Sequence, residues 1–260
     1  MTTATHTHAV PRSRSSSTAR SRKGAKQAKP LRFSSYKAGR DIIPIPRQCR
    51  RHITRFFESI EQSTIERYKA DWTTIIPKSD HEALNRWRFA YCTVHTTWEN
   101  SCDQYNRFKH TYEDQEYPAL VRLLKDSGGG MWDIKAYGIA ILHYLWQIQS
   151  PLFDKPTRKW QAFRNNIQSN LPKLGLAKTS FAIEMLYPHD AQIICIDRHM
   201  FKAFGWEDVD RACSDAQYHY YENYWVDISN EYNLAPVISR NLFWDIIQQQ
   251  DSSMYWAKHL

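Results

Sequence analysis

Apolar side chains recur at steps of three and four residues along most of the chain after residue 50. This spacing places them on one face of an α-helix, whereas a half-buried strand requires strict alternation. Proline and glycine fall between these stretches, where turns are expected. The pattern therefore predicts an all-α fold with helices over Ile53–Tyr68, His81–Tyr112, Ala119–Lys125, Ile134–Gln149, Thr157–Asn170, Ala177–Tyr187, Arg198–Phe204, Asp215–Tyr232 and Ala235–Gln250.

Asp197 follows a short run of consecutive apolar residues. The strand signal of the chain is confined to Gln192–Ile196, which is too short to need a sheet. Because residues 193–196 are Ile-Ile-Cys-Ile, we expect this run to be buried and Asp197 to lie at the mouth of a dry pocket. A charge is costly to bury, so a carboxylate in that position is usually functional. The alternative role of Asp197 is to cap the N-terminus of the helix predicted over 198–204.

A glycine-containing turn separates two predicted helices within about residues 161–187. The first helix ends near Asn170, the turn has the sequence Pro-Lys-Leu-Gly at 172–175, and the second helix begins near Ala177. The exposed N–H groups of such a turn and the positive end of the second helix favour a phosphate oxygen. The residues expected to contact such a phosphate are Lys173, Leu174, Gly175, Leu176 and Ala177.

The segments LPKLGLAKTS at 171–180 and IDRH at 196–199 resemble the helix-hairpin-helix DNA glycosylase superfamily. The superfamily pattern is roughly L-P-G-(V/L)-G-x-(K/x)-x-A, followed by an Asp that often precedes x-H. The resemblance implies a helical DNA-binding fold with Asp197 as the catalytic carboxylate and His199 nearby. Lys173 departs from it by replacing the first hairpin glycine, and Ala177 falls where lysine-dependent members carry their Schiff-base lysine. Lys178 comes one residue later, about 100° further around a helix, which predicts a different direction for its side chain.

Residues 56–108 resemble a second, narrower family, the alpha-glutamyl/putrescinyl thymine pyrophosphorylases, which are phage amino acid:DNA transferases. The resemblance rests on a helix that begins at Phe56, a Trp-Thr turn, and an Arg88-Phe89 helix followed by Asp103. It implies an enzyme that modifies bases in double-stranded DNA by joining an amine to the activated 5-methylene carbon of a modified thymine. A phage protein of this kind would act as a monomer in the host cytoplasm.

The same region supplies the expected binding site for the amine donor. Arg88, Glu99 and Asp103 are spaced by eleven and four residues on one predicted helix, which places them near a common face. Arg88 and Asp103 are therefore predicted to hold a small amine or amino acid, and a buried structural ion pair is the alternative. The aromatic side chains of which one or two are expected to line the pocket are Phe89, Tyr91, Trp98 and Phe181.

Charge is distributed unevenly along the chain. The formal net charge is +8, but ten basic residues precede the first acidic residue, Asp41, so the rest of the chain carries about −2. Residues 1–40 are rich in Ser, Thr, Ala and Lys, which predicts a disordered basic tail followed by one domain over 41–260. Such a tail adds salt-sensitive affinity for DNA phosphates. A solubilising tail and a transit peptide are the alternatives.

Other sequence features narrow the class of protein. The five cysteines form no C-x-x-C pair, so free thiols and a reducing compartment are expected. Only Cys213 follows Asp197, which leaves no iron–sulfur loop there, and neither a metal nor a cofactor is expected. The best apolar stretch, residues 137–148, is too short to span a membrane.

Three functions fit the sequence, with amino acid:DNA transfer first. In that reaction Asp197 is the general base for the incoming amine, while Lys178 and His199 offset charge on the departing phosphate or pyrophosphate. The alternative is a DNA glycosylase in which Asp197 stabilises positive charge at the sugar C1′, and Ala177 favours base removal without a lysine-linked intermediate. A non-catalytic DNA-binding module is third, because it leaves a buried Asp197 without a role.

Overall fold

A computed structural model describes residues 42–109, 117–128, 130–206, 213–250 and 253–260. The chain divides into the units Met1–Lys37 and Ala38–Leu260, and the fold described here is that of the second unit. The predicted basic tail over residues 1–40 lies outside the described residues, so its disorder and its boundary stay predictions. Within the ranges given above, the fold has eleven α-helices, two 3₁₀ helices and no strand.

The first six helices belong to residues 47–147. They are α1 (Arg47–Ser59), α2 (Gln62–Thr74), α3 (Asp80–Cys92), α4 (Trp98–Phe108), α5 (Tyr117–Asp126) and α6 (Trp132–Gln147). The remaining elements are η2 (Pro151–Phe153), α7 (Trp160–Asn170), α8 (Leu176–Leu186), α9 (Arg198–Ala203), α10 (Asp215–Glu231), α11 (Pro236–Gln248) and η3 (Ser253–His259).

Two of the predicted helices are each divided in the structure. The helix predicted over Ile53–Tyr68 is interrupted at Ile60 and Glu61, whose backbones are extended. The helix predicted over His81–Tyr112 ends at Cys92, and Thr97 caps a new helix by accepting the Asn100 N–H. Apolar periodicity shows which face is buried but not whether the backbone continues, so both single-helix predictions are wrong.

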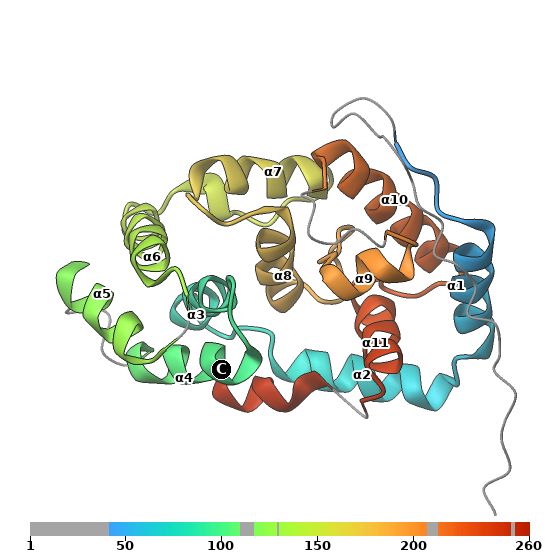
Figure 1. Ribbon diagram of the computed structural model, residues 1–260, viewed down its shortest axis with the longest axis horizontal. Helices are drawn as coiled ribbons and strands as arrows, with labels where there is room; N and C mark the ends of the chain where they lie inside the picture. The colour runs from blue at the N-terminus through green and yellow to red at the C-terminus, as the bar shows by residue number, and fades with distance from the viewer. Residues whose placement is uncertain (1–41, 110–116, 129, 207–212, 251–252) are drawn as a thin grey trace, which may run out of the picture. The chain divides into compact units, whose positions relative to one another are not determined.

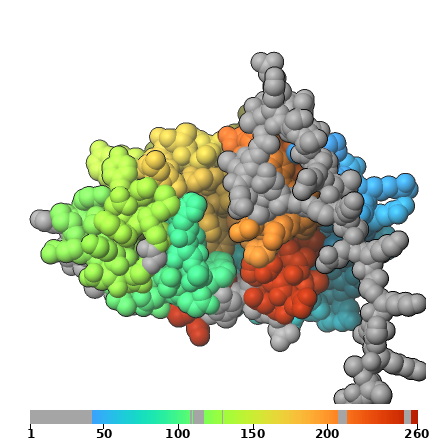
Figure 2. All heavy atoms as spheres, viewed as in Figure 1, coloured from blue at the N-terminus to red at the C-terminus, as the bar shows by residue number. Residues whose placement is uncertain are grey.

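Helix α8 lies in the middle of the fold (Figure 1). It packs against α3 on one side and α7 on another, while α11 packs against α2, α9 and α10. In the space-filling view, the green segments around α4 to α6 lie on the left and the larger red area lies to the right of them, while the red C-terminal η3, which packs against α4, shows below the green segments (Figure 2). The central position of α8 places its N-terminus, and the turn before it, between these two groups of helices.

Aromatic side chains fill the core on both sides of α8. Phe56 and Phe57 of α1 pack against Trp225 of α10, which also contacts Phe243 of α11. A second cluster joins α3, α4, α8 and η3 through Phe89, Trp98, Phe181 and Trp256. Large rings of this kind bury much apolar surface, which explains how a chain of mean hydropathy −0.66 forms a core.

A close contact between α3 and α6 reaches the turn before α8. Gly138 of α6 leaves room for Tyr91, because a Cβ atom there would lie 2.2 Å from Cε1 of the Tyr91 ring. The Tyr91 hydroxyl in turn donates a hydrogen bond to the Pro172 carbonyl at 3.1 Å. The glycine thus lets a buried tyrosine hold the turn at residues 171–175 in place.

Candidate active site

The predicted hairpin is formed by α7, residues 171–175 and α8. Lys173 has a φ of 66°, in the left-handed region that glycine adopts without strain. A lysine therefore takes the geometry for which the superfamily pattern has a glycine, at a cost of about 1 kcal/mol. Gly175 is the N-cap of α8, with an extended backbone and open space around its Cα.

Asp197 caps α9 and also reaches a cavity. Its Oδ1 accepts the N–H groups of His199 and Met200, each at 3.0 Å. Its Oδ2 accepts the indole N–H of Trp244 in α11 at 2.7 Å. The capping role considered from the sequence is therefore present in the structure, together with the predicted pocket position. Three donors fix the orientation of the carboxylate.

Two cavities meet at Asp197 and Lys178, and both residues line each of them. The larger cavity is open, measures about 860 Å³, and lies beside the hairpin turn and residues 93–96. The smaller measures about 40 Å³ and is too narrow to admit a base as it stands. The side chains that give the smaller cavity its aromatic wall are Trp98, Phe181, Trp244 and Trp256.

Lys178 lies on the first turn of α8 and is half-buried. Burial lowers the pKa of its ammonium group below the ordinary lysine value, and nearby Arg240 lowers it further, while Asp197 opposes the shift. The ammonium also lies 5.9 Å from the centre of the Phe181 ring. The one-residue offset from the superfamily lysine therefore does not turn Lys178 away from Asp197. Ala177 lines only the larger of the two cavities.

The other predicted catalytic and DNA-contacting residues divide into two groups. Lys173, Gly175, Leu176 and Ala177 line the larger cavity, whereas the Leu174 side chain is buried beneath the turn. His199 lies next to the cap but its Nδ1 pairs with Gln248 of α11 at 2.6 Å, and its ring meets Trp244 edge-on. Contact of the hairpin residues with DNA stays a prediction.

The residues predicted to bind an amine donor do not converge. Arg88 is fully buried in α3 and donates to Asn85, and Phe89 is fully buried in the aromatic core. Asp103 is on the surface of α4, where it forms an ion pair with Arg107 at 2.9 Å. Trp98 alone of the four lines a cavity next to Asp197. The shared face assumed for Arg88 and Asp103 is lost because the helix is broken between them.

Several side chains at the cavities were not predicted. Trp244 and Arg240 of α11 line the smaller cavity. Glu184 of α8 does not line it but pairs with Arg240 at 3.0 Å. Burial raises the pKa of Glu184 to about 7 despite this ion pair. The sequence signal that could have identified Arg240 and Glu184 is a charged residue within an otherwise apolar helix. In the part of the chain that the structure describes, no group of three His, Cys, Asp or Glu side chains is arranged to hold a metal.

Comparison with known proteins gives a match in structure but none in sequence. A scan against protein-family models and a search of curated proteins both find no match. Among solved structures, the 8-oxoguanine DNA glycosylase of Methanocaldococcus jannaschii matches with a TM-score of 0.63 and 18% identity, over 78% of this chain and 97% of that one. The same enzyme in complex with a 15mer DNA containing 8-oxoguanine matches with a TM-score of 0.62 and 18% identity, over 77% and 97%.

A bacterial structure gives the same result. The 8-oxoguanine DNA glycosylase of Thermotoga maritima matches with a TM-score of 0.61 and 13% identity, over 78% of this chain and 97% of that one. The chain has a DNA glycosylase-like fold. This confirms the all-α glycosylase-like fold predicted from the hairpin. In the described ranges, no helix is long and apolar enough to cross a membrane.

Proposed function

We propose that this protein is a DNA glycosylase that removes an altered base through Lys178 and Asp197. The observation that carries the proposal is that these two residues line the same two cavities, directly behind a hairpin turn. The solved structures with this fold are named as 8-oxoguanine DNA glycosylases, and one of them holds DNA. Base excision thus ranks above the amino acid:DNA transfer favoured by the sequence.

Lys178 is suited to act as the nucleophile. Its lowered pKa increases the fraction of neutral amine near neutral pH, and only the neutral amine has a free electron pair. Nζ forms a bond to the sugar C1′ while the bond from C1′ to the base nitrogen breaks, and the base leaves with that electron pair. The proton released from the attacking amine ends on the departing base. The nitrogen electron pair then forms the C=N bond while the bond from C1′ to O4′ breaks. O4′ takes a proton from water, and the product is a ring-opened, protonated Schiff base.

Asp197 is suited to stabilise the sugar during this step. Positive charge develops at C1′ as the bond to the base breaks, and a nearby carboxylate offsets that charge. The three N–H donors to Asp197 keep its two oxygens in place without rearrangement. The carboxylate also serves as the acceptor for the amine proton on its way to the base.

The hairpin is suited to hold the DNA strand. Lys173 and the open N-terminus of α8 offer a positive charge and backbone donors to a phosphate. An enzyme that acts on a base in a duplex has to rotate the nucleotide out of the stack. The larger cavity has room for that nucleotide, with the base directed toward the aromatic side chains behind Asp197. We take 8-oxoguanine as the first base to test.

Amino acid:DNA transfer stays a prediction, with the same two residues in different roles. In that reaction the amine attacks the 5-methylene carbon, phosphate leaves, and the glycosidic bond remains. Lys178 would then interact with the leaving phosphate only electrostatically. The two reactions therefore differ in one measurable respect, which is whether a covalent bond forms between the protein and the sugar.

The test is borohydride trapping combined with mass spectrometry of the products. The protein is incubated with duplexes that carry 8-oxoguanine or a phosphorylated hydroxymethyluracil, the latter with a mixture of amino acids and polyamines. We expect a covalent complex and free 8-oxoguanine from the wild type. We expect neither from Lys178→Ala or Lys178→Arg. Lys173→Ala is the matched control, because it removes a neighbouring lysine but leaves the nucleophile, so it should still trap at saturating protein.

Two results would contradict the proposal. A mass gain on the modified nucleoside with an intact glycosidic bond assigns amino acid:DNA transfer instead. Duplex binding without any product from either substrate reduces the protein to a DNA-binding module, provided that other oxidised and deaminated bases are also left in place.

A further inference from the structure

The segment that leads to Asp197 is held by side chains rather than by a sheet. Residues 193–196 belong to no helix or strand in the described ranges. Their consecutive N–H groups instead donate to three buried side chains. Ile194 donates to Glu222 at 3.2 Å, Cys195 to Glu184 at 2.7 Å, and Ile196 to the hydroxyl of Tyr218 at 3.0 Å. The backbone donors of residues 194–196 are thus satisfied by side chains of α8 and α10.

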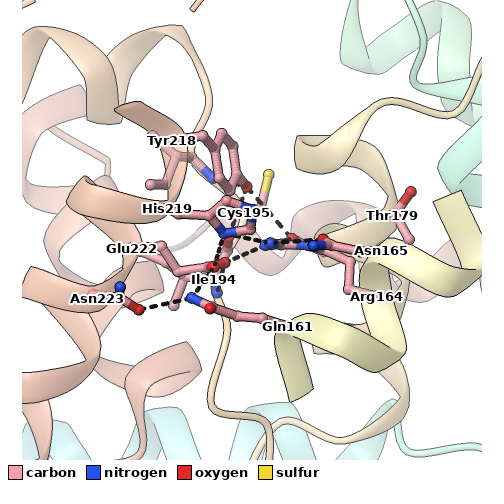
Figure 3. Close-up of polar contacts among 12 residues, drawn as sticks. Gln161, Arg164, Asn165, Thr179, Ile194, Cys195, Tyr218, His219, Glu222 and Asn223 are labelled. Carbon is pink, nitrogen blue, oxygen red and sulfur yellow. Dashed lines mark hydrogen bonds and ion pairs between the residues drawn. The ribbon is translucent and has the colours of Figure 1, made fainter. Parts of the chain in front are cut away.

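Glu222 belongs to a buried polar cluster between α7 and α10 (Figure 3). Its Oε1 forms an ion pair with Arg164, and both side chains are fully buried. Arg164 also donates to Ser180 of α8 at 3.1 Å, while Gln161 donates to the Oε2 of Glu222 at 2.9 Å. A buried ion pair is weak evidence for stability, since desolvation offsets the attraction between the charges. Its geometric effect here is to fix the carboxylate that accepts the Ile194 N–H.

Tyr218 makes the most direct connection to the catalytic carboxylate. Its hydroxyl accepts from Ile196, the residue before Asp197, and donates to the Ile194 carbonyl at 2.8 Å. Burial raises the pKa of this hydroxyl well above its ordinary value, so it keeps its proton and can donate at any pH of interest. One oxygen therefore bridges two backbone groups on the segment that leads to Asp197.

We infer that Tyr218 and Glu222 are positioning residues for Asp197, acting through the backbone of residues 194–196. This inference rests on the proposed function, because it assigns them to the same reaction. A displacement of about 1 Å in a reacting group can cost about 100-fold in rate. Without the Tyr218 hydroxyl, one buried N–H and one buried C=O lose a partner, and the segment has to shift to satisfy them.

The principal variant is Tyr218→Phe, which removes only the hydroxyl oxygen. The control is Tyr221→Phe, which removes the same atom from the next turn of α10, where the side chain is also buried and stacks on Phe204. Tyr218 lines the larger cavity and Tyr221 does not, so the DNA dissociation constant is needed to separate a lost DNA contact from a displaced Asp197. Single-turnover rate and DNA dissociation constant are measured separately on a duplex carrying the base that the wild type excises. We expect Tyr218→Phe to lower the rate about 10- to 100-fold. The dissociation constant should change less than about threefold, and Tyr221→Phe should retain the wild-type rate.

A second measurement reads the geometry without activity. The amide signals of His199 and Met200 report the cap that Asp197 forms, and they can be followed by nuclear magnetic resonance in the full chain. We expect them to shift in Tyr218→Phe and in Glu222→Gln, but not in Tyr221→Phe. Glu222→Gln leaves Arg164 without its charge partner and can therefore unfold the protein. Its amide shifts are used only if circular dichroism and thermal unfolding show that the variant is folded. If it is not folded, Tyr218→Phe alone decides the test.

The inference is overturned if Tyr218→Phe excises at the wild-type rate while Asp197→Asn is inactive. It is also overturned if the two amide signals stay in place, or if the rate falls only together with DNA affinity and thermal stability. Failure of the proposed function looks different. In that case the wild type releases no base and Asp197→Asn changes nothing, whereas the amide shifts in Tyr218→Phe still appear.

Discussion

Replacing Trp244 with phenylalanine should slow base excision without unfolding the protein. The indole N–H of Trp244 donates to Oδ2 of Asp197 at 2.7 Å, on the side of the carboxylate that the helix cap leaves free. Phenylalanine keeps a ring in the same place and loses only this donor and part of the ring volume. The Trp244 ring lies 5.8 Å from the His199 ring, measured between centroids, and a phenylalanine ring keeps an aromatic contact at this place.

The size of the effect follows from the strength of a hydrogen bond to a charged acceptor. Such a bond contributes about 1.5–3 kcal/mol, and each 1.4 kcal/mol corresponds to a factor of ten. If the whole bond acts by orienting Asp197 in the transition state, the rate falls by about 10- to 150-fold. Trp244 is 7% exposed, so water can replace part of the lost bond and the lower end of this range is expected.

The assay is a single-turnover excision measurement on a duplex that the wild type processes. Trp146→Phe is the matched control, because Trp146 lies on α6 and packs against Phe153, away from both cavities at Asp197. Thermal unfolding of both variants checks that the fold is kept. A rate within about twofold of wild type in Trp244→Phe would refute the argument, since it would mean that the backbone cap alone orients Asp197.

The general fold could be predicted from the sequence because its signals are local. Helices such as α6, α8 and α10 have apolar positions in phase with their own turns, and the predicted ranges overlap the observed ones. The breaks at Ile60 and at residues 93–97 could not be placed in this way, because the apolar spacing is compatible with a continuous helix. The Thr97 cap was a usable signal for the second break.

In the candidate site, too, the residues with a local sequence signal could be predicted, whereas those placed by long-range contacts could not. Asp197 was predicted because an apolar run precedes it, and the hairpin because its turn is short and contains glycine. The direction of the Lys178 side chain could not be predicted, because it depends on the left-handed backbone at Lys173 and on the residue at which α8 begins. Trp244, Tyr218 and Glu222 are 22 to 47 residues from the groups they contact at this segment, and sequence spacing says nothing about such contacts.

Three further predictions concern lysines in different surroundings. Lys173→Gly should raise the free energy of unfolding by about 1 kcal/mol, because glycine adopts the left-handed turn without strain; denaturant unfolding measures this change. The same variant should bind DNA more weakly because a positive charge is lost, which a series of binding measurements at different salt concentrations checks. The single-turnover rate should rise with pH and level off below the ordinary pKa of lysine, because the Lys178 pKa is lowered; a flat profile contradicts a lysine nucleophile. Lys135 is buried and donates to the Cys92 carbonyl and to Gln104, and burial lowers its pKa to about 8. The unfolded chain therefore holds this proton up to a higher pH than the folded protein does, so the free energy of unfolding should gain up to roughly 3 kcal/mol as the pH rises from about 8 to about 10.5. Cysteines and tyrosines that titrate in the same range are common to wild type and Lys135→Met, so the difference between the two unfolding curves isolates the lysine. A difference that stays constant over this range would show that Lys135 is solvated in the folded state.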